Sequence, residues 1–220
     1  MPEPLIQLEG VEKRFDDRAG AAPTLTVSIL TIERGERVAL MGASGSGKTT
    51  LLNLIGGLLA ADAGQVRVAG ADLTALGEAG RDRFRARHVG YLFQTFHLLD
   101  GWTALENVEL GAAFARHRPA PGRAVELLTA VGLSDRLSHW PSQLSVGQQS
   151  RVALARALIN KPEVLLADEP TGALDADAGR AALRLILDTA RAEGTTVVCA
   201  THDPAVAGSF DRVIRVEDLR

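Results

Sequence analysis

Residues 42–49 read Gly42-Ala43-Ser44-Gly45-Ser46-Gly47-Lys48-Thr49, which is the full spacing of a phosphate-binding loop. A short apolar segment, Val38 to Met41, precedes the loop, and a segment with helix character, Thr49 to Leu59, follows it. Glycines let the backbone curl so that several N–H groups point at one anion, and the start of a helix adds about half a positive charge. The alternative is a glycine-rich connector with a chance lysine, which would not require a strand before it and a helix after it. We therefore interpret residues 42–49 as a phosphate-binding cradle.

The chemistry of such a cradle assigns roles to its side chains. The Lys48 ammonium is predicted to reach the β- and γ-phosphates of ATP and to assist catalysis, and the Thr49 hydroxyl is predicted to ligate Mg²⁺. The expected cofactors are therefore ATP and Mg²⁺. The cradle positions predicted to contact the nucleotide are Gly42, Ser44, Gly45, Ser46, Gly47, Lys48, Thr49 and Thr50.

An apolar segment, Val164 to Ala167, ends in two acids, Asp168 and Glu169. In open α/β sheets, ligands bind at the carboxyl ends of strands. Asp168 is therefore predicted to hold Mg²⁺, directly or through water. Glu169 is predicted to be the general base, or at least to position the attacking water, a role worth about 10²–10⁴ in rate. Alone, such a pair could equally be solvated acids after a strand, but the phosphate-binding loop favours the catalytic interpretation.

Apolar patterning elsewhere predicts an α/β core with a helical lobe in the middle of the chain. A helix with Leu183, Ile186, Leu187 and Ala190 on its buried face is expected to stop at Gly194. A loop is expected at 16–22, and Asp203-Pro204 reads as a helix cap. Further predicted strands are Leu5–Leu8, Leu25–Ile32, Gln65–Val68, Val89–Phe93 and Thr195–Ala200, and further predicted helices are Ala104–Phe114, Arg123–Val131 and Val152–Ile159.

The composition is that of one ordinary folded domain, with 220 residues, 46% hydrophobic and 23% charged. A net charge of −3 gives no support for nucleic-acid binding, and the basic cluster Arg81 to His88 reads as a solvated helix face. The single cysteine, Cys199, excludes an internal disulfide. No secretion signal is recognised at Met1 to Pro4, and the apolar stretch Leu51 to Ala63 is too short to span a bilayer, so a partner is expected to carry any membrane-spanning part.

Further motifs make the chain resemble the ATPase subunits of ABC transporters over nearly its whole length. Leu144-Ser145-Val146-Gly147-Gln148 is similar to the ABC signature, a motif specific to this family among P-loop proteins. The other matches are Gln94 with the Q-loop, Asp175 with the D-loop, His202 with the switch histidine and Phe15 with the aromatic ring that stacks on adenine. Taken alone, Phe15 could be a core residue and His202 a surface histidine before a helix cap.

The resemblance implies a fold and its subdivision. The fold class is α/β, a RecA-like P-loop NTPase core with a small N-terminal antiparallel β subdomain and an inserted α-helical subdomain. Residues 1–94 and 160–220 would form the nucleotide-binding core with the β subdomain. Residues 95–159 would form the helical subdomain that carries the signature.

The resemblance also implies a mechanism in which two subunits close head to tail around two ATP molecules. The signature helix, expected to begin near Gly147, would then face the γ-phosphate of the other subunit with its N–H groups and the Ser145 hydroxyl. Gln94 would contact Mg²⁺ or the attacking water and His202 the γ-phosphate, both in catalytic roles. In the signature and the D-loop, the residues implied to contact nucleotide are Ser145, Gly147, Gln148 and Asp175.

The implied partners are a second copy of the ATPase subunit and integral membrane permease subunits, with no nucleic acid. The implied location is the cytoplasmic face of the inner cell membrane, as a peripheral protein. Within the family, Phe93 to Leu99 and Thr103 to Val108 resemble the lipoprotein-release and macrolide-export branch, the LolD, MacB and FtsE type.

Val146 departs from the family, which usually has glycine at this position. If the backbone needs a positive φ there, valine is strained, and weakened closure or slower turnover is expected. Two alternatives stay open. One is a soluble ABC-type ATPase of DNA maintenance or translation, although those usually need a long coiled coil or two fused ATPase domains. The other is an ATP-sensing module without turnover, which Val146 favours and the intact Lys48, Asp168, Glu169 and His202 oppose.

Overall fold

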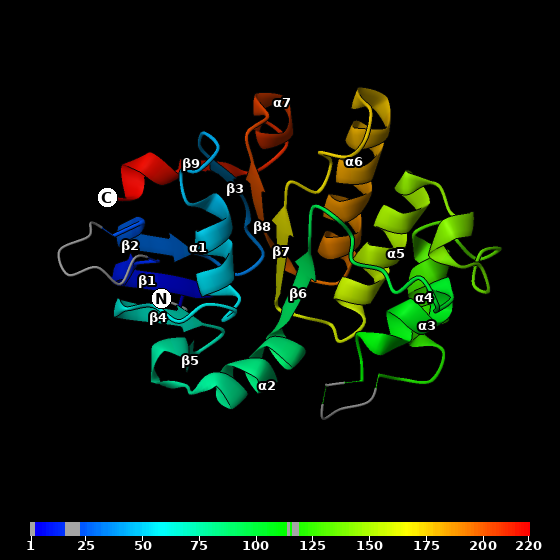
Figure 1. The fold of residues 1–220 in the computed structure, drawn as a ribbon, viewed down its shortest axis with the longest axis horizontal. Helices are drawn as coiled ribbons and strands as arrows, with labels where there is room; N and C mark the ends of the chain where they lie inside the picture. The colour runs from blue at the N-terminus through cyan, green and yellow to red at the C-terminus, as the bar shows by residue number, and fades with distance from the viewer. Residues whose placement is uncertain (1–2, 16–22, 114, 116–118) are drawn as a thin grey trace. The chain divides into compact units, whose positions relative to one another are not determined.

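The computed structural model describes residues 3–15, 23–113, 115 and 119–220, and it divides into two compact units. The first unit comprises Met1–Arg85 and Val198–Arg220, and the second comprises Ala86–Val197 (Figure 1). The loop predicted at 16–22 and the last residue of the helix predicted at 104–114 lie outside the described residues. The subdomain boundaries predicted at 94/95 and 159/160 stay a prediction.

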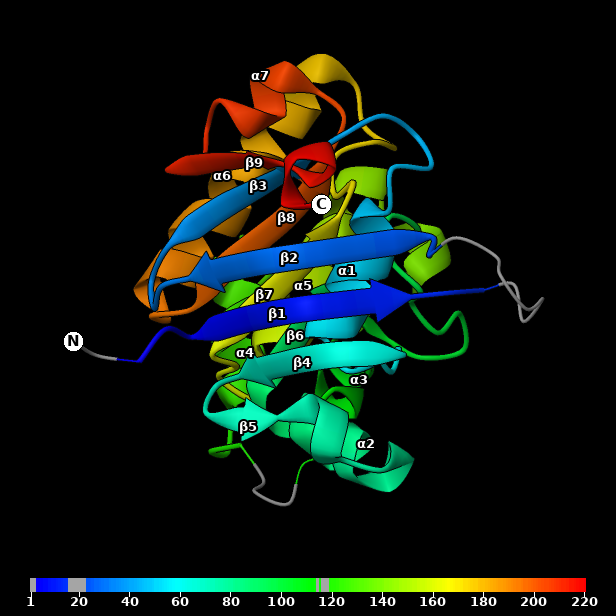
Figure 2. The ribbon, with the colours of Figure 1, turned by 90° about the vertical axis from the view of Figure 1, so that its left-hand side faces the viewer.

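An antiparallel sheet with the strand order β2-β1-β4-β5 forms one part of the first unit, and Figure 2 shows its three long strands side by side. Residues alternate between buried and accessible along β1, which pairs with β2 so that Ile6 faces Ile32. The sheet bends where β1 and β4 shift register, and there a side chain on Gly64 would overlap the Gly10 carbonyl. The strands are β1 (Ile6–Lys13), β2 (Leu25–Ile32), β4 (Ala63–Val68) and β5 (Ala71–Asp72).

The rest of the first unit contains β3 (Arg37–Met41) between β8 (Thr196–Thr201) and β9 (Arg212–Arg215). Strand β3 is parallel to β9 and leads through the phosphate-binding loop into α1 (Lys48–Ile55). Helix α1 is shorter than the predicted Thr49 to Leu59, because Gly57 takes a left-handed φ of +68° just past its end. The short helices here are η1 (Leu73–Ala75), α2 (Glu78–His88), α7 (Pro204–Ala207) and η3 (Val216–Leu219).

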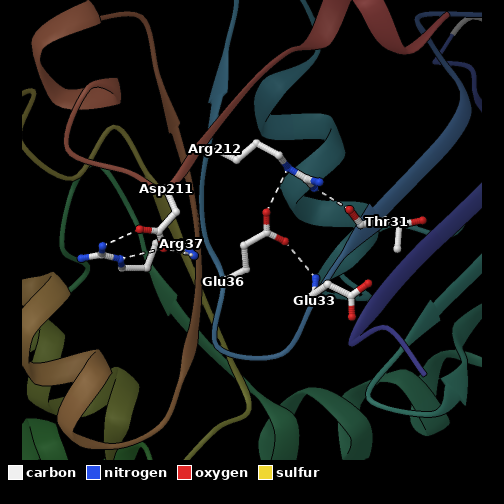
Figure 3. A network of polar contacts seen from close by, with 6 residues as sticks. All are labelled: Thr31, Glu33, Glu36, Arg37, Asp211 and Arg212. Carbon is white, nitrogen blue, oxygen red and sulfur yellow. Dashed lines mark hydrogen bonds and ion pairs between the residues drawn. The ribbon is translucent and has the colours of Figure 1, made fainter. Parts of the chain in front are cut away.

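Ion pairs hold the start of β3 to the start of β9 (Figure 3). The guanidinium of Arg37 donates to both carboxylate oxygens of Asp211, at 3.0 and 2.5 Å. Arg212 pairs with Glu36 at 3.0 Å, and Glu36 also accepts a hydrogen bond from the backbone N–H of Glu33. These contacts fix the turn between β2 and β3, from which the strand that leads to the phosphate-binding loop begins.

The second unit packs helices beside the strands β6 (Val89–Leu92) and β7 (Val164–Asp168), which are parallel and are followed in the sheet by the beginning of β8. Gly90 lets α5 approach β6, since a side chain there would overlap the Ala157 carbonyl. The buried face predicted for α6 is confirmed, and the helix ends two residues before Gly194, whose φ is +70°. The helices are α3 (Ala104–Leu110), α4 (Arg123–Ala130), η2 (Pro141–Gln143), α5 (Val146–Leu158) and α6 (Ala176–Ala192).

The antiparallel sheet, the parallel strands and the surrounding helices agree with the predicted α/β class. Across the described parts of the chain, helices fall short of the length and apolar character that crossing a bilayer requires.

Candidate functional site

The phosphate-binding loop of the first unit has the backbone that its glycines predict. Gly45 and Gly47 take left-handed φ values of +80° and +100°, which residues with a Cβ rarely adopt. Lys48 is 8% exposed, and its ammonium donates to the carbonyl oxygens of Gly42 and Ala43 at 2.8 and 3.1 Å. The positive charge is therefore held against the loop, at the start of α1.

Two features of the cradle favour an anion as its ligand. The side chain of Ser46 has a buried Oγ without a hydrogen-bond partner among the described residues, so its hydroxyl is available to a ligand. Helix α1 has Gly47 as its N-cap, so no side chain caps it, and its first turn, which includes Thr49 and Thr50, has no acidic residue. Uncapped N–H groups at a helix start, with a lysine beside them, suit a phosphate group.

Glu217, in η3, is a neighbour of this loop that the sequence analysis did not identify. A Cβ placed on Gly42 would lie 2.9 Å from the Glu217 Oε1 and closer still to the Ser46 Oγ. A side chain at position 42 would therefore have to displace Ser46 and Glu217, whatever the ligand. The sequence carries no local signal for this contact, because residues 42 and 217 are far apart along the chain.

Phe15 and His202 belong to the same unit as the cradle. The Phe15 ring is 59% exposed with the Lys13 ammonium 5.8 Å from its centroid, so it is not a core residue and offers a face for stacking. His202 is exposed and follows the buried end of β8. The Thr201 hydroxyl accepts from the Asp203 N–H at 3.1 Å, and Asp203 caps α7 as predicted, so the turn that carries His202 is held on both sides.

The acidic pair lies in the second unit, at the end of β7. Burial raises the pKa of the Tyr91 hydroxyl, and the nearby negative charge of Asp168 adds to this shift. Asp168 thus places a carboxylate in a partly buried position, and carboxylate oxygens are hard ligands of the kind that Mg²⁺ prefers. Glu169 has a φ of +47°, an uncommon conformation for a residue with a side chain and one that occurs at functional sites.

The Gln94 side chain lies beside Gly172, in the turn that follows Glu169. A Cβ placed on Gly172 would be 3.6 Å from the Gln94 Nε2 and 3.8 Å from the Glu169 Cβ. The Gly172 N–H also donates to the Glu169 carbonyl at 3.0 Å. The Gln94 amide and the base of the Glu169 side chain therefore both lie beside Gly172.

The signature begins α5, one residue earlier than the predicted start near Gly147. Ser145 is the N-cap, its hydroxyl accepts from the Gln148 N–H at 3.3 Å, and the Gln148 side chain accepts from the Ser145 N–H at 2.9 Å. Val146 is the first helical residue, has no positive φ and is 47% exposed, so the strain considered for valine is not present. Asp175 caps α6 in the same way and accepts from two backbone N–H groups.

Two further polar residues in the second unit were missed by the sequence analysis. Asn107 is fully buried in α3, and Arg156 lies in α5. Both bind the backbone of the loop after Gln94. A sequence signal existed only for Asn107, which directly follows the capping-box residues Thr103 and Glu106.

Comparisons with known proteins agree with this geometry. The model of the family described as ABC transporter matches residues 25–172. The chain belongs to the ABC transporter family. The macrolide export ATP-binding/permease protein MacB 2 of Aeromonas hydrophila subsp. hydrophila is 47% identical over 222 residues, which cover 100% of this chain and 34% of that protein. The lipoprotein-releasing system ATP-binding protein LolD of Maricaulis maris is 45% identical, covering 99% of this chain and 96% of that protein.

A solved dimeric structure of an ATP-binding cassette, in a post-hydrolysis state bound to ADP and Pi, is 39% identical with a TM-score of 0.84. The match covers 96% of this ABC transporter family chain and 93% of the solved one. The P-loop NTPase fold and the resemblance to the LolD and MacB branch are thereby confirmed. The chain spans about a third of the length of the MacB relatives and nearly the whole of LolD.

Proposed function

We propose that this chain is the ATP-binding and ATP-hydrolysing part of an ABC transporter, in which nucleotide-driven dimerisation moves a membrane permease. The observation that carries the proposal is the cradle of the first unit. It combines left-handed glycines, the uncapped start of α1, the folded-back Lys48 ammonium and the unpartnered Ser46 hydroxyl. These groups match the charge and the hydrogen-bonding capacity of a polyphosphate.

The proposed ligand is Mg-ATP. The loop N–H groups and Lys48 would hold the phosphates, and the exposed Phe15 ring would stack on adenine. The Thr49 hydroxyl and the Asp168 carboxylate, with Gln94, offer the oxygen ligands that suit Mg²⁺. When bound, the ion would neutralise charge on the β- and γ-phosphates.

For hydrolysis, we assign the general-base or water-positioning role to Glu169. Its carboxylate would act with the nearby Gln94 amide on the water that attacks the γ-phosphate. His202 would hydrogen-bond the γ-phosphate, and Lys48 would stabilise charge that develops on it. The left-handed backbone of Glu169 supports this assignment, because such conformations cluster where a side chain must be aimed.

The proposed partners are a second copy of this chain and integral membrane permease subunits, at the cytoplasmic face of the inner cell membrane; no nucleic acid is expected. In the dimer, the start of α5 in one copy would face the nucleotide held by the P-loop of the other. The capping box of Ser145 and Gln148 leaves the N–H groups of Val146 and Gly147 for that phosphate. Apart from the neighbouring residues of α5, no atom of the described part of the chain lies within 4 Å of a Cβ placed on Gly147. Asp175 would add a contact from the start of α6.

Single-turnover hydrolysis by the purified chain tests the proposal. With Mg²⁺, we expect release of phosphate from ATP, and we expect Glu169→Gln to bind ATP normally while its hydrolysis falls by about 10²-fold or more. Asp177→Asn is a matched control, since it removes an exposed carboxylate from the first turn of α6. A wild-type chain that binds no nucleotide, or a Glu169→Gln chain with undiminished hydrolysis, would contradict the proposal.

A further inference from the structure

Residues 95–103, here called the clamped loop, follow Gln94 and are held by Asn107 of helix α3. The Asn107 side chain is fully buried, and its amide nitrogen donates to the carbonyls of Leu99, Trp102 and Thr103 at 3.0 to 3.1 Å. Its amide oxygen accepts from the Leu99 N–H at 2.8 Å. A buried amide with all its partners in one loop gives that loop a defined conformation.

The beginning of the clamped loop is held by Arg156 of helix α5. Its guanidinium donates one N–H to the His97 carbonyl at 2.6 Å and another to the Phe96 carbonyl at 2.5 Å. Burial lowers the pKa of this guanidinium. A planar fork that binds two successive carbonyls fixes their orientation, which a lysine ammonium does not do in the same way.

The two residues that flank Gln94 both contact His97. The Phe93 ring meets the His97 ring edge-on, with centroids 5.0 Å apart, and stacks on Tyr91 at 4.1 Å. The Thr95 hydroxyl lies 3.1 Å from the His97 Nε2, and the Thr95 carbonyl accepts from the His97 N–H. His97 itself has a φ of +48°, so its carbonyl is aimed by an uncommon backbone conformation. Holding that carbonyl therefore also restrains Gln94.

Arg156 belongs to the same helix as the signature residue Ser145. Arg156 is 11 positions beyond Ser145, the N-cap of this helix, and at 1.5 Å per residue this separation spans about 16 Å. Val152, Leu154 and Leu158 bury this helix in the core of the second unit. The Arg156 fork thus joins α5 to the carbonyls of Phe96 and His97, in the loop that follows Gln94.

We propose that Arg156 is a positioning residue that couples Gln94 to the signature helix, with Asn107 making the clamped loop rigid enough to carry the coupling. This inference rests on the proposed ATPase function, since it assigns Arg156 an effect on hydrolysis. Arg156 acts through Gln94 and leaves the phosphate cradle, which belongs to the first unit, unchanged. Losing the fork should therefore lower kcat and leave nucleotide affinity as it was.

Arg156→Lys is the informative variant, because it keeps the charge and removes the fork. Arg151→Lys is its matched control, since Arg151 lies on the same helix and makes a single hydrogen bond of 3.3 Å to the Val131 carbonyl. Asn107→Asp replaces the amide nitrogen by oxygen and tests the other end of the loop. Each variant is studied in the full chain, by Mg-ATP turnover, nucleotide binding and amide hydrogen exchange.

For Arg156→Lys we expect kcat to fall about tenfold or more, as for a reacting group displaced by a fraction of an ångström. The nucleotide Kd should change less than about twofold, and amide exchange in residues 95–99 should rise about tenfold, while Arg151→Lys should match wild type in all three measurements. Asn107→Asp keeps the oxygen that accepts from the Leu99 N–H but loses the donor to the carbonyls of Leu99, Trp102 and Thr103, so amide exchange across residues 99–103 should rise.

Unchanged kcat and unchanged loop exchange in Arg156→Lys would overturn the inference. A parallel loss of nucleotide affinity, or exchange rising across the whole second unit, would also overturn it by giving Arg156 a general structural role. A wild-type chain without ATP turnover would refute the proposed function instead. In that case the loop exchange would still decide whether the fork holds the clamped loop.

Discussion

The Lys48 ammonium donates a 2.8 Å hydrogen bond to the carbonyl oxygen of Gly42, six residues earlier, and closes the phosphate-binding loop on itself. A second bond, to the Ala43 carbonyl, is longer at 3.1 Å. An arriving phosphate offers the ammonium a negatively charged acceptor in place of neutral carbonyls, and a hydrogen bond between opposite charges is stronger than one to a neutral carbonyl. Phosphate binding therefore changes the hydrogen-bond partners of Lys48, while the loop keeps its conformation.

Lys48→Met tests this exchange, because methionine keeps most of the length of the side chain and removes the charge. We expect the variant to fold, since the two carbonyls can bind water instead, and to lose ATP affinity by at least about 10²-fold, which corresponds to two charge-assisted contacts of about 1.5 kcal/mol each. A binding titration at micromolar ATP measures this. Wild-type ATP affinity in the variant would show that Lys48 does not bind the phosphates.

Phe15→Ala tests the contribution of the adenine base to ATP binding separately from that of the phosphates. The ring is largely exposed, so its loss should change the free energy of unfolding by less than about 0.5 kcal/mol. Loss of stacking should weaken ATP binding by about 1–3 kcal/mol, whereas inorganic triphosphate, which has no base, should bind as before. Equal weakening for both ligands would mean that Phe15 supports the loop and does not stack on adenine.

Ser145→Ala and Thr103→Ala form a matched pair, since each removes the N-cap of a capping box in the second unit. Both should lower the free energy of unfolding by about 1 kcal/mol. Only Ser145→Ala should also impair nucleotide-driven dimerisation, because only that cap belongs to the signature. Equal dimerisation in the two variants would show that Ser145 acts only as a helix cap.

Val146→Gly restores the residue that the family usually has. Because Val146 is helical and unstrained, glycine relieves nothing inside the chain and should cost up to about 1 kcal/mol of stability. Its exposed side chain, however, stands at the start of α5, where the partner's phosphate is proposed to approach. Faster turnover or a tighter dimer is therefore expected, as measured by steady-state kinetics, and unchanged kinetics would show that valine is neutral.

Local patterns in the sequence predicted much of this structure. Strand β2 has the predicted bounds, and Asp203 caps α7 as its residue type predicts. The loop glycines were predicted for the same reason, since a positive φ is a property of a single residue. The acidic pair predicted Glu169 and the family motifs added Gln94, and the structure places both beside Gly172.

Contacts between distant residues were outside the reach of those patterns. Arg156 binds carbonyls about 60 positions earlier, and a carbonyl acceptor carries no signature in the sequence, because every residue has one. Glu217 contacts the Gly42 region from the other end of the chain. The left-handed backbone of Glu169 was likewise not predictable, since a glutamate prefers other conformations and tertiary structure imposes this one.

The central claim is that two copies of this chain hold ATP between the P-loop of one and the signature of the other. The most direct test is the mass of Glu169→Gln in solution with saturating Mg-ATP, measured by light scattering, with Ser145→Ala added as a second substitution for comparison. The account predicts about twice the monomer mass of 23.3 kDa with ATP, a monomer with ADP, and a weakened dimer when Ser145 is also replaced. A Glu169→Gln chain that binds ATP and stays monomeric would contradict it.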